Sequence, residues 1–305
     1  MQRYLLSIFG QAILVLLGVF ILVFLMVRLT GDPTSVMLSR EASAEQRAEF
    51  RERMGFNRPL PIQFVDFVTN AVRGDFGNSL HYRLPALGLV LERLPASLEL
   101  AFIGLFMAVI IAVPLGLAGG TRPGSAPDVI GRTIGLLGQT MPAYWLALVM
   151  IIVFAVKFGW LPTSGRSGWD SVLMPAFTLA LPTMGRLVRL TRSAVMEIMG
   201  DDYIRTARGK GLSNQTIFYR HVLRNAAIAL ISVVGVQFSY MLGGSVLIEN
   251  VFSWPGLGKL AYESISNRDF PLVQAIAIFS SVVVIAVNLL VDLAYPLFDP
   301  RIGYE

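Results

Sequence analysis

Long uncharged and largely apolar stretches recur along the chain, separated by charged segments. A helix needs about 20 apolar residues to cross the hydrocarbon core of a bilayer. The stretches that reach this length are Tyr4–Val27, Leu100–Thr121, Thr133–Val156, Asn225–Ile248 and Phe270–Val291. We therefore predict an all-α, polytopic integral membrane protein in which each of these stretches is a transmembrane helix.

A further uncharged stretch, Ser171–Gly185, is shorter and contains Pro175 and Pro182. Its length is close to that of a re-entrant segment. We still predict a span here, because Arg186 and Arg189 follow it and can lengthen it by placing their charged ends at the membrane interface. The sequence thus predicts six transmembrane helices.

The first apolar stretch follows Met1-Gln2-Arg3. It is too long for the apolar region of a signal peptide, and no A-x-A-like cleavage site ends it. We expect an uncleaved first span.

A polar segment separates the first two predicted spans. Glu41–Arg53 has the pattern of a polar helix, which Pro59 and Pro61 then break. Gly74–Ser79 is rich in turn residues. The expected divisions are 1–29 for the N-terminal segment and first span, 30–95 for an extracytoplasmic helical cap, 96–298 for a transmembrane core with a cytoplasmic loop at 186–225, and 299–305 for a cytoplasmic tail.

Composition supports membrane integration over a soluble fold. Of the 305 residues, 54% are hydrophobic and 15% are charged, whereas soluble domains carry about 25% charged residues. The mean hydropathy is +0.63. The chain has no cysteine and two histidines, which excludes disulfides and thiolate metal sites and makes a histidine-based metal site unfavourable. We expect no metal and no cofactor on this chain.

The basic residues predict the orientation of the chain. The segments proposed to be cytoplasmic carry Arg3, Arg122, Arg132, eight basic residues between Arg186 and Arg224, and Arg301. The short loops proposed to lie outside carry Lys157, Arg166, Lys259 and Arg268. Because Lys and Arg concentrate in short cytoplasmic loops, we predict that both termini are cytoplasmic. Topology explains the net charge of +5 better than a nucleic-acid partner does.

The basic loop after the fourth predicted span has an internal pattern. Asp201 and Asp202 suit the N-terminus of a short helix, and Gly211 is placed to end it in a left-handed conformation. Ser213 or Asn214 can cap a second helix. A solvated loop that only sets topology is the alternative to a docking element. We favour docking because we expect the loop to expose too many apolar side chains for a passive loop: Tyr203, Ile204, Ile217, Phe218 and Tyr219.

The same loop carries a resemblance. Its two sequences, DYIRTARGKG at 202–211 and RHVLRNA at 220–226, resemble the cytoplasmic coupling motif of permease subunits of ATP-binding-cassette (ABC) importers, in the dipeptide, oligopeptide and nickel branch, which also includes glutathione permeases. Against the general form of that motif, Ala207, Gly211 and Leu223 match. The chain departs from it at Arg205, Thr206 and Arg224, where the general motif has Glu, Ala and Pro.

Other stretches resemble this branch in the same order along nearly the whole chain, and they match the first of its two non-identical permeases. They are Gly31–Pro33, Gly74–Ser79, Arg93–Leu100, Pro142–Trp145, Gly159–Pro162, Phe252–Gly258, Arg268–Pro271 and Asp299–Arg301. The resemblance implies a type I ABC importer permease architecture in a bacterial inner membrane.

The resemblance also implies partners: a second homologous permease, two cytoplasmic ATPase subunits that bind ATP and Mg, and an extracytoplasmic solute-binding protein. Residues implied in coupling to the ATPase are Asp201, Asp202, Tyr203, Arg205, Thr206, Ala207, Arg208, Lys210, Gly211 and Leu212. Di- and oligopeptides are the expected cargo. Nickel, glutathione or sugar carried by the same machinery, and an autonomous channel or secondary carrier, are the alternatives.

The chain shows no motif for chemistry of its own. Gly209-Lys210 and Gly258-Lys259 are not followed by Ser or Thr, so neither is a phosphate-binding loop. Asp292 is the only carboxylate that we place near the interior of a span, and it has no evident catalytic partner. We predict no catalytic residues and no enzymatic activity.

Polar residues within the predicted spans mark a candidate path for the transported solute. Gln237, Tyr240 and Gly244 share one helix face, and Gln139 and Tyr144 lie in the third predicted span. Tight helix packing is the rival explanation for the glycines of the fifth span. Between the last two spans, Trp254, Pro255 and Gly256 form either a re-entrant scoop or a docking surface for the binding protein.

Overall fold

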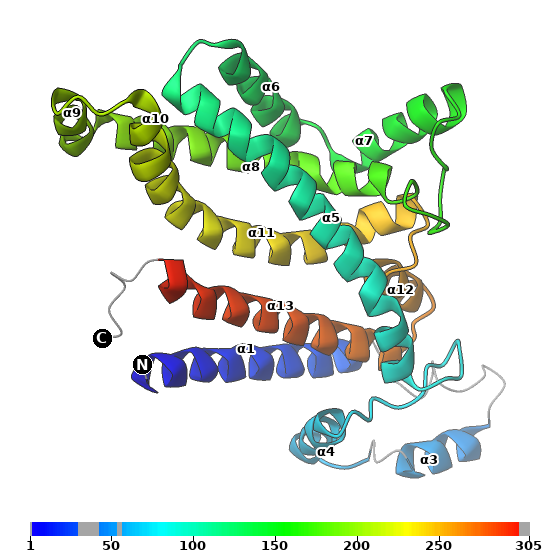
Figure 1. Cartoon of the computed structure of the whole chain (residues 1–305). Helices are drawn as coiled ribbons and strands as arrows, with labels where there is room; N and C mark the ends of the chain where they lie inside the picture. Colours follow the sequence, from blue (N-terminus) through cyan, green and yellow to red (C-terminus); the bar gives the residue numbers. More distant parts are fainter. Residues whose placement is uncertain (1, 30–42, 54–56, 299–305) are drawn as a thin grey trace. The chain divides into compact units, whose positions relative to one another are not determined.

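The computed structural model describes residues 2–29, 43–53 and 57–298, and these fold almost entirely into helices (Figure 1). In chain order the elements are α1 (Gln2–Leu29), α3 (Ala44–Arg53), α4 (Leu60–Val72), α5 (Ala86–Thr121), α6 (Ala126–Thr140), α7 (Ala143–Met150), the π-helix η1 (Ile151–Lys157), α8 (Leu173–Gly200), α9 (Asp202–Gly209), α10 (Asn214–Ile217), the π-helix η2 (Phe218–Val222), α11 (Leu223–Val251), α12 (Leu257–Ser266) and α13 (Phe270–Phe298). The all-α prediction is confirmed. The motifs Gly31–Pro33 and Asp299–Arg301, and the predicted tail 299–305, lie outside the described residues.

Three described helices are long and apolar enough to cross a membrane: Phe9–Val27 within α1, Ala86–Thr121, and Phe270–Val291 within α13. The bent pair formed by α6 with α7 and η1 makes up to four. By length and composition, the described residues therefore contain fewer candidate spans than the six that the sequence predicts. Helices α8 and α11 are 28 and 29 residues long, but α8 carries several arginines and some side chains of α11 are not described.

The prediction of one continuous span over Thr133–Val156 is wrong. The chain breaks at Met141 and Pro142, and the helices on either side are bent by 108°. Proline lacks a backbone N–H and disfavours a helical conformation in the residue before it. Met141 accordingly has an extended backbone, with φ −81° and ψ 122°.

Helix α5 starts at Ala86, well before the expected start of the second span at Leu100. The motif Arg93–Leu100 is therefore helical. Before it, the predicted polar helix is present as α3, where Ser43 and Gln46 cap each other reciprocally at 2.9 and 3.2 Å.

Contacts divide the described chain into two compact units. The first comprises Met1–Pro95 and Leu260–Ala286, and the second comprises Ala96–Lys259 with the described part of Val287–Gly303. The N-terminal part of the first unit ends at Pro95, which is also the predicted end of the helical cap. Residues 260–286, which we expected in the transmembrane core, belong instead to the first unit.

Within the first unit, an aspartate fixes the connector that precedes α5. Asp269 is fully buried and accepts hydrogen bonds from the backbone N–H of Leu80 at 3.1 Å and of His81 at 3.2 Å, and from the hydroxyl of Ser79. It also accepts from the N–H of Leu272 in the first turn of α13, at 3.4 Å. The motifs Gly74–Ser79 and Arg268–Pro271, which are distant in sequence, thus meet at one carboxylate.

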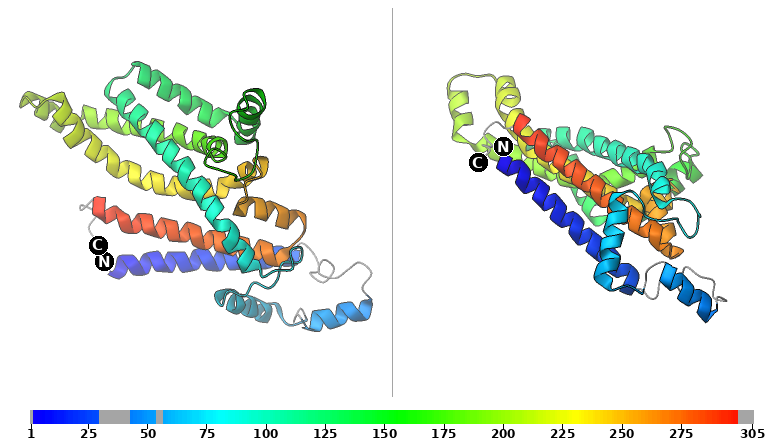
Figure 2. Two further views of the ribbon diagram at one scale, coloured as in Figure 1. Left: turned by 45° about the vertical axis from the view of Figure 1, so that its right-hand side comes forward. Right: turned by 90° about the horizontal axis from the view of Figure 1, so that it is seen from below.

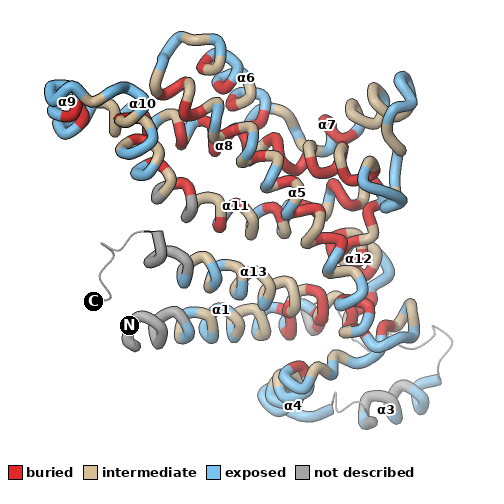
Figure 3. Tube along the Cα trace, viewed as in Figure 1, coloured by how far each residue is buried: buried red, intermediate tan, exposed pale blue. Residues whose placement is uncertain are grey.

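Within the second unit, α8 is the central helix. It contacts α6, α7 and α11, and α8 and α11 run side by side in the views of Figure 2. Buried residues occur on all sides of its first five turns (Figure 3). The uncharged stretch Ser171–Gly185 is short for a span, and the burial of α8 explains why. A helix that packs against protein needs fewer apolar residues than a helix that faces lipid.

Glycines allow α5 and α6 to approach α8 closely. A Cβ at Gly120 of α5 would lie 2.6 Å from the Cβ of Val195, and one at Gly131 of α6 would lie 2.9 Å from Val188. Each of these glycines has a second glycine four residues away, Gly116 and Gly135. Such small-residue spacing is typical of helix packing in membranes.

An ion pair joins the start of α6 to α8. Asp128 is buried, and its carboxylate accepts from Nε of Arg192 at 2.6 Å and from the N–H of Gly124 at 2.8 Å. Arg132 lies 3.5 Å away on α6. This contact fixes the turn between α5 and α6 against the later part of α8.

A second buried carboxylate, Glu249 of α11, joins two more of the motifs. Its Oε1 accepts from the hydroxyls of Ser97 at 2.7 Å and Ser245 at 2.8 Å, and its Oε2 accepts from the N–H of Lys259 at 3.0 Å. Our statement that Asp292 is the only carboxylate near a span interior is therefore wrong, since Glu249 directly follows the predicted fifth span and is fully buried.

We predict that Gly120→Ala destabilises the protein by about 1–3 kcal/mol, because the added methyl group overlaps Val195. Gly88→Ala in the same helix is the matched control, since no atom lies within 4 Å of its added Cβ. The measurement is the thermal unfolding midpoint of each purified variant in detergent. Equal midpoints for both variants would contradict the close packing of α5 on α8.

We predict that Glu249→Gln lowers stability by about 1–3 kcal/mol, because an amide cannot accept all of the hydrogen bonds that the carboxylate accepts. Glu197→Gln, at an exposed position on α8, controls for the loss of one negative charge. Both variants are compared with the unmodified protein by thermal unfolding in detergent. A midpoint for Glu249→Gln as high as that of the control would contradict this role of the buried carboxylate.

Candidate functional site

The helix α9 begins and ends where the sequence predicts. Asp201 precedes it in an extended conformation, although its side chain makes no capping hydrogen bond. Gly211 follows it with φ +77°, a left-handed conformation that glycine adopts readily. The N–H of Leu212 donates to the carbonyl of Ala207 at 3.2 Å, and that of Gly211 to Arg208 at 2.9 Å. This pair of bonds is the Schellman motif that ends many helices.

The chain then turns into α10 and η2. Of the two predicted caps, Ser213 is the one observed, and its hydroxyl accepts from the N–H of Thr216 at 3.2 Å. The π-helical turn of η2 continues directly into α11. We call Asp201–Val222 the α9–η2 segment.

The inner side of the α9–η2 segment is packed against the second unit. Ile204 and Val222 are fully buried, and Ala207 and Ile217 are nearly so. They share a hydrophobic cluster with Leu117, Val195 and Ala226, against which Phe218 also packs. The expectation that Ile204, Ile217 and Phe218 are exposed is thus wrong, because these side chains hold the segment in place.

The outer side of α9 is basic and exposed. Tyr203, Arg205, Thr206, Arg208 and Lys210 are exposed. Arg205 lies 3.3 Å from Asp202, but both side chains are largely exposed, so this ion pair contributes little to stability. Of the residues implied in coupling, Ala207 faces inward and Leu212 is half-buried, while the others face solvent.

Tyr203 connects α9 to the beginning of α11. Its hydroxyl accepts from the side-chain amide of Asn225 at 3.0 Å, and its ring centroid lies 6.0 Å from that of His221. Sequence reasoning assigned no role to Asn225. The sequence does contain an indication of this contact, because Tyr203 and Asn225 belong to the two halves of the loop motif, 202–211 and 220–226.

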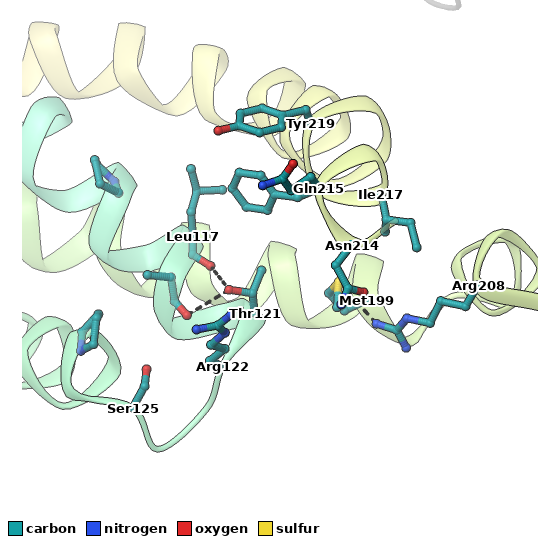
Figure 4. Close-up of a pocket in the computed structure, with 14 residues that line it drawn as sticks. Leu117, Thr121, Arg122, Ser125, Met199, Arg208, Asn214, Gln215, Ile217 and Tyr219 are labelled. Atoms are coloured by element: carbon teal, nitrogen blue, oxygen red, sulfur yellow. Dashed lines mark hydrogen bonds between the residues drawn. The ribbon is translucent and has the colours of Figure 1, made fainter. Parts of the chain in front are cut away.

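A pocket of about 770 Å³ opens beside this segment (Figure 4). Its walls come from the end of α5, the α5–α6 turn, α8, α9, α10 and η2. Leu117 and Ile217 line it together with the polar residues Thr121, Arg122 and Arg208. The exposed side of α9 and this hollow are therefore adjacent.

The candidate path residues do not form one surface. Gln237 is buried, whereas Tyr240 is 64% exposed and Gly244 is exposed with no atom within 4 Å of an added Cβ. Gln139 and Tyr144 are exposed on the two sides of the bend between α6 and α7. Gly235, by contrast, packs closely against Val291 of α13.

Gln237 is hydrogen-bonded to Arg186, a residue that the sequence predicts at the membrane interface. Nη1 of Arg186 on α8 donates to Oε1 of Gln237 at 2.9 Å. The guanidinium carbon of Arg186 lies 5.8 Å from the ring centroid of Tyr240. The sequence predicts Arg186 to be an interfacial anchor of the fourth span, whereas in the structure it points toward the polar side chains of α11.

Trp254 does not present a surface. It is fully buried, its indole N–H donates to the carbonyl of Ala96 at 2.8 Å, and Gly256 lies against Ser97 and Glu249. Pro255 is half-buried. The side chain of Trp254 thus holds this segment to α5 and is not available as an exposed docking surface. The other alternative, a re-entrant scoop, stays a prediction.

The chain matches known protein families over nearly its whole length. Residues 112–304 match the family described as "Binding-protein-dependent transport system inner membrane component", and residues 1–101 match the N-terminal region of membrane components of such systems.

Among curated relatives, the chain is 37% identical over 306 residues to the glutathione transport system permease protein GsiC of Salmonella typhimurium (strain LT2), with 100% of both chains covered. It is 35% identical over 316 residues to the oligopeptide transport system permease protein AppB of Bacillus subtilis (strain 168), again with 100% of both covered. It is 36% identical to the probable peptide ABC transporter permease protein y4tP of Sinorhizobium fredii (strain NBRC 101917 / NGR234), over 96% of each chain.

Solved structures support the same fold. A chain of the MetNI methionine ABC transporter, in inward-facing conformations, has a TM-score of 0.54 and 20% identity, covering 70% of this chain and 97% of that chain. A chain of an amino acid ABC transporter has a TM-score of 0.55 and 17% identity, with 69% and 94% covered. The chain belongs to the family of binding-protein-dependent transport system inner membrane components, the permease subunits of ABC importers.

Proposed function

We propose that this chain is the first of two permeases in an ATP-driven importer of small peptides, and that α9 transmits the motion of an ATPase subunit to the membrane helices. The observation that carries the proposal is the two-sided character of α9. Its inner side is anchored by Ile204 and Ala207, and its outer side is basic and exposed. A short helix that is rigidly held yet exposed on one side suits docking into a groove of a partner.

The connections of α9 support a coupling role. Gly200 and Asp201 join it directly to α8, and Tyr203 bonds to Asn225 at the beginning of α11. A displacement of α9 is therefore applied to both helices, which also contact each other. Closure of the ATPases would move α8 and α11 together and change which side of the membrane the path faces.

The relatives support the substrate class. The similar permeases are named for glutathione, peptide and oligopeptide transport. Glutathione is itself a small peptide, so one chemical class covers these relatives, and we extend it to this chain. Transport of nickel or sugar by the same machinery is the alternative, and uptake assays with those solutes separate the cases.

The charge distribution supports an orientation in which both termini and the α9–η2 segment are cytoplasmic. The α9–η2 segment itself carries Arg205, Arg208, Lys210 and Arg220, and short loops rich in Lys and Arg remain in the cytoplasm. The inner membrane of a bacterium is the compartment that fits the family. The proposed partners are a second permease, two ATPase subunits that hold ATP and Mg, and an extracytoplasmic binding protein.

An autonomous channel or secondary carrier is the competing class of function. Such a protein transports in liposomes without nucleotide or partners. Reconstitution of this chain with and without the ATPase subunits separates the two classes, and uptake without ATP would overturn the importer proposal.

We predict that the double variant Arg205→Glu/Lys210→Glu loses ATPase subunits during purification and lowers ATP-dependent uptake at least tenfold, because it reverses the charge of the exposed side of α9. The control is Lys157→Glu at the end of η1, which changes charge away from α9. Co-purification and proteoliposome uptake are measured for both variants. Full retention of the ATPase by the double variant would contradict docking through this side.

We predict that Gly211→Val uncouples the importer, since a β-branched residue is strained at φ +77° and shifts the end of α9. Gly209→Val is the matched control, because Gly209 is helical and no atom lies within 4 Å of its added Cβ. The expected result is at least a tenfold loss of binding-protein-stimulated ATP hydrolysis for Gly211→Val and less than a threefold loss for the control. Equal activities would show that the left-handed turn has no role in coupling.

A further inference from the structure

We propose that Arg186 is a binding site for the carboxylate group of the transported peptide. This inference rests on the proposed function and extends it to recognition within the membrane. It is carried by the position of one guanidinium, by its partners and by the hydrogen-bond donors that those partners leave free.

The contact between Arg186 and α11 indicates how deep in the membrane this arginine lies. Arg186 donates to Gln237 at 2.9 Å, and Gln237 lies close to the midpoint of the uncharged stretch Asn225–Ile248 of α11. An arginine that only anchors the end of a span extends its charged group toward the interface. Arg186 instead places its charge beside the middle of a neighbouring apolar helix.

Two arginines of α8, Arg186 and Arg192, differ in the charge of their partners. Arg192 pairs with the buried Asp128 at 2.6 Å. For Arg186, no carboxylate among the described residues lies within ion-pair distance, and its contacts are the neutral amide of Gln237 and the ring of Tyr240. A charged side chain within a membrane normally pairs with an opposite charge or lines a water-filled path. Arg186 lacks the pairing that Arg192 has.

The guanidinium of Arg186 has hydrogen-bond donors that Gln237 does not use. A guanidinium has five N–H groups in a planar fork, and Gln237 accepts from one nitrogen, Nη1. The side chain of Arg186 is exposed, as is the ring of Tyr240 beside it. A carboxylate is the group whose two oxygens match this fork. Gln237 and Tyr240 orient the guanidinium and leave its other donors free.

The chemistry selects among the possible cargoes. Small peptides, including glutathione, carry at least one free carboxylate, whereas a neutral sugar carries none. A fixed positive charge repels an unchelated metal cation. An exposed single arginine also binds weakly, which suits a site that a solute must leave again during transport.

The test uses the whole importer in proteoliposomes, with partner permease, ATPases and binding protein. Uptake of tri-alanine and of glutathione is compared for the unmodified protein, Arg186→Gln, Arg186→Lys and the matched control Arg189→Gln, which removes an exposed arginine one turn away. We expect at least a tenfold loss for Arg186→Gln, a two- to fivefold loss for Arg186→Lys, and less than a twofold change for Arg189→Gln. ATP hydrolysis stimulated by the binding protein should persist in Arg189→Gln.

A second measurement keeps the test decisive if Arg186→Gln does not assemble. Phenylglyoxal modifies accessible arginines, and mass spectrometry quantifies the modification at Arg186 in the unmodified importer. We expect tri-alanine to slow this modification and the C-terminal amide of tri-alanine to leave it unchanged.

The outcomes distinguish a failure of the proposed importer function from a failure of the Arg186 site. Absence of ATP-dependent uptake of either peptide by the unmodified importer would overturn the proposed function and this inference with it. Normal peptide uptake that is unaffected by Arg186→Gln would overturn the Arg186 site alone. Equal protection of Arg186 by the peptide and its amide would also overturn it, and would assign Arg186 to helix packing or to the partner permease.

Discussion

The second unit depends on a helix, α8, that can occupy a membrane only when other helices surround it. Three arginines lie between residues 186 and 192 of this helix, and within a membrane each needs a partner that lipid cannot supply. Glycines of α5 and α6 allow these helices to approach α8 within contact distance. Asp128 then pairs with Arg192, and Gln237 of α11 accepts from Arg186. Close packing and polar pairing are therefore two aspects of one arrangement, and the α9–η2 segment extends from it.

Much of the helical content follows from the sequence, because apolar length alone identifies α1, α5 and α13. What the apolar pattern could not predict is set by tertiary contacts and by single residues. Pro142 divides a stretch that is uncharged throughout. The uncharged stretch Ser171–Gly185 is short because arginines follow it within α8. Since α8 packs against protein, a criterion based on lipid-facing helices undervalues this segment.

In the α9–η2 segment, too, the sequence predicts the helix ends but not which side chains are buried. The ends of α9 and the cap at Ser213 follow from local residue preferences at helix termini, so the sequence predicts them. Which side of α9 faces solvent depends on Val195, Leu117 and Ala226, which come from three other helices. For the same reason Ile204, which we expected to be exposed, is buried. Trp254 is also buried, although an exposed docking surface was one of the two predictions for it. The roles of Glu249 and Asp269 required knowing which motifs meet in space.

The distribution of partners along α8 has a consequence for the order in which the protein is made. In an isolated helix, an arginine at the membrane centre costs about 2.5–3.5 kcal/mol on insertion scales. Synthesis produces α5 and α6 before α8, so Asp128 is already available when Arg192 emerges. Gln237 belongs to α11 and is synthesised later, so Arg186 has no partner until that helix arrives. The two partners of α8 therefore become available at different times: one comes from the helices made before α8, and the other comes from a helix made after it.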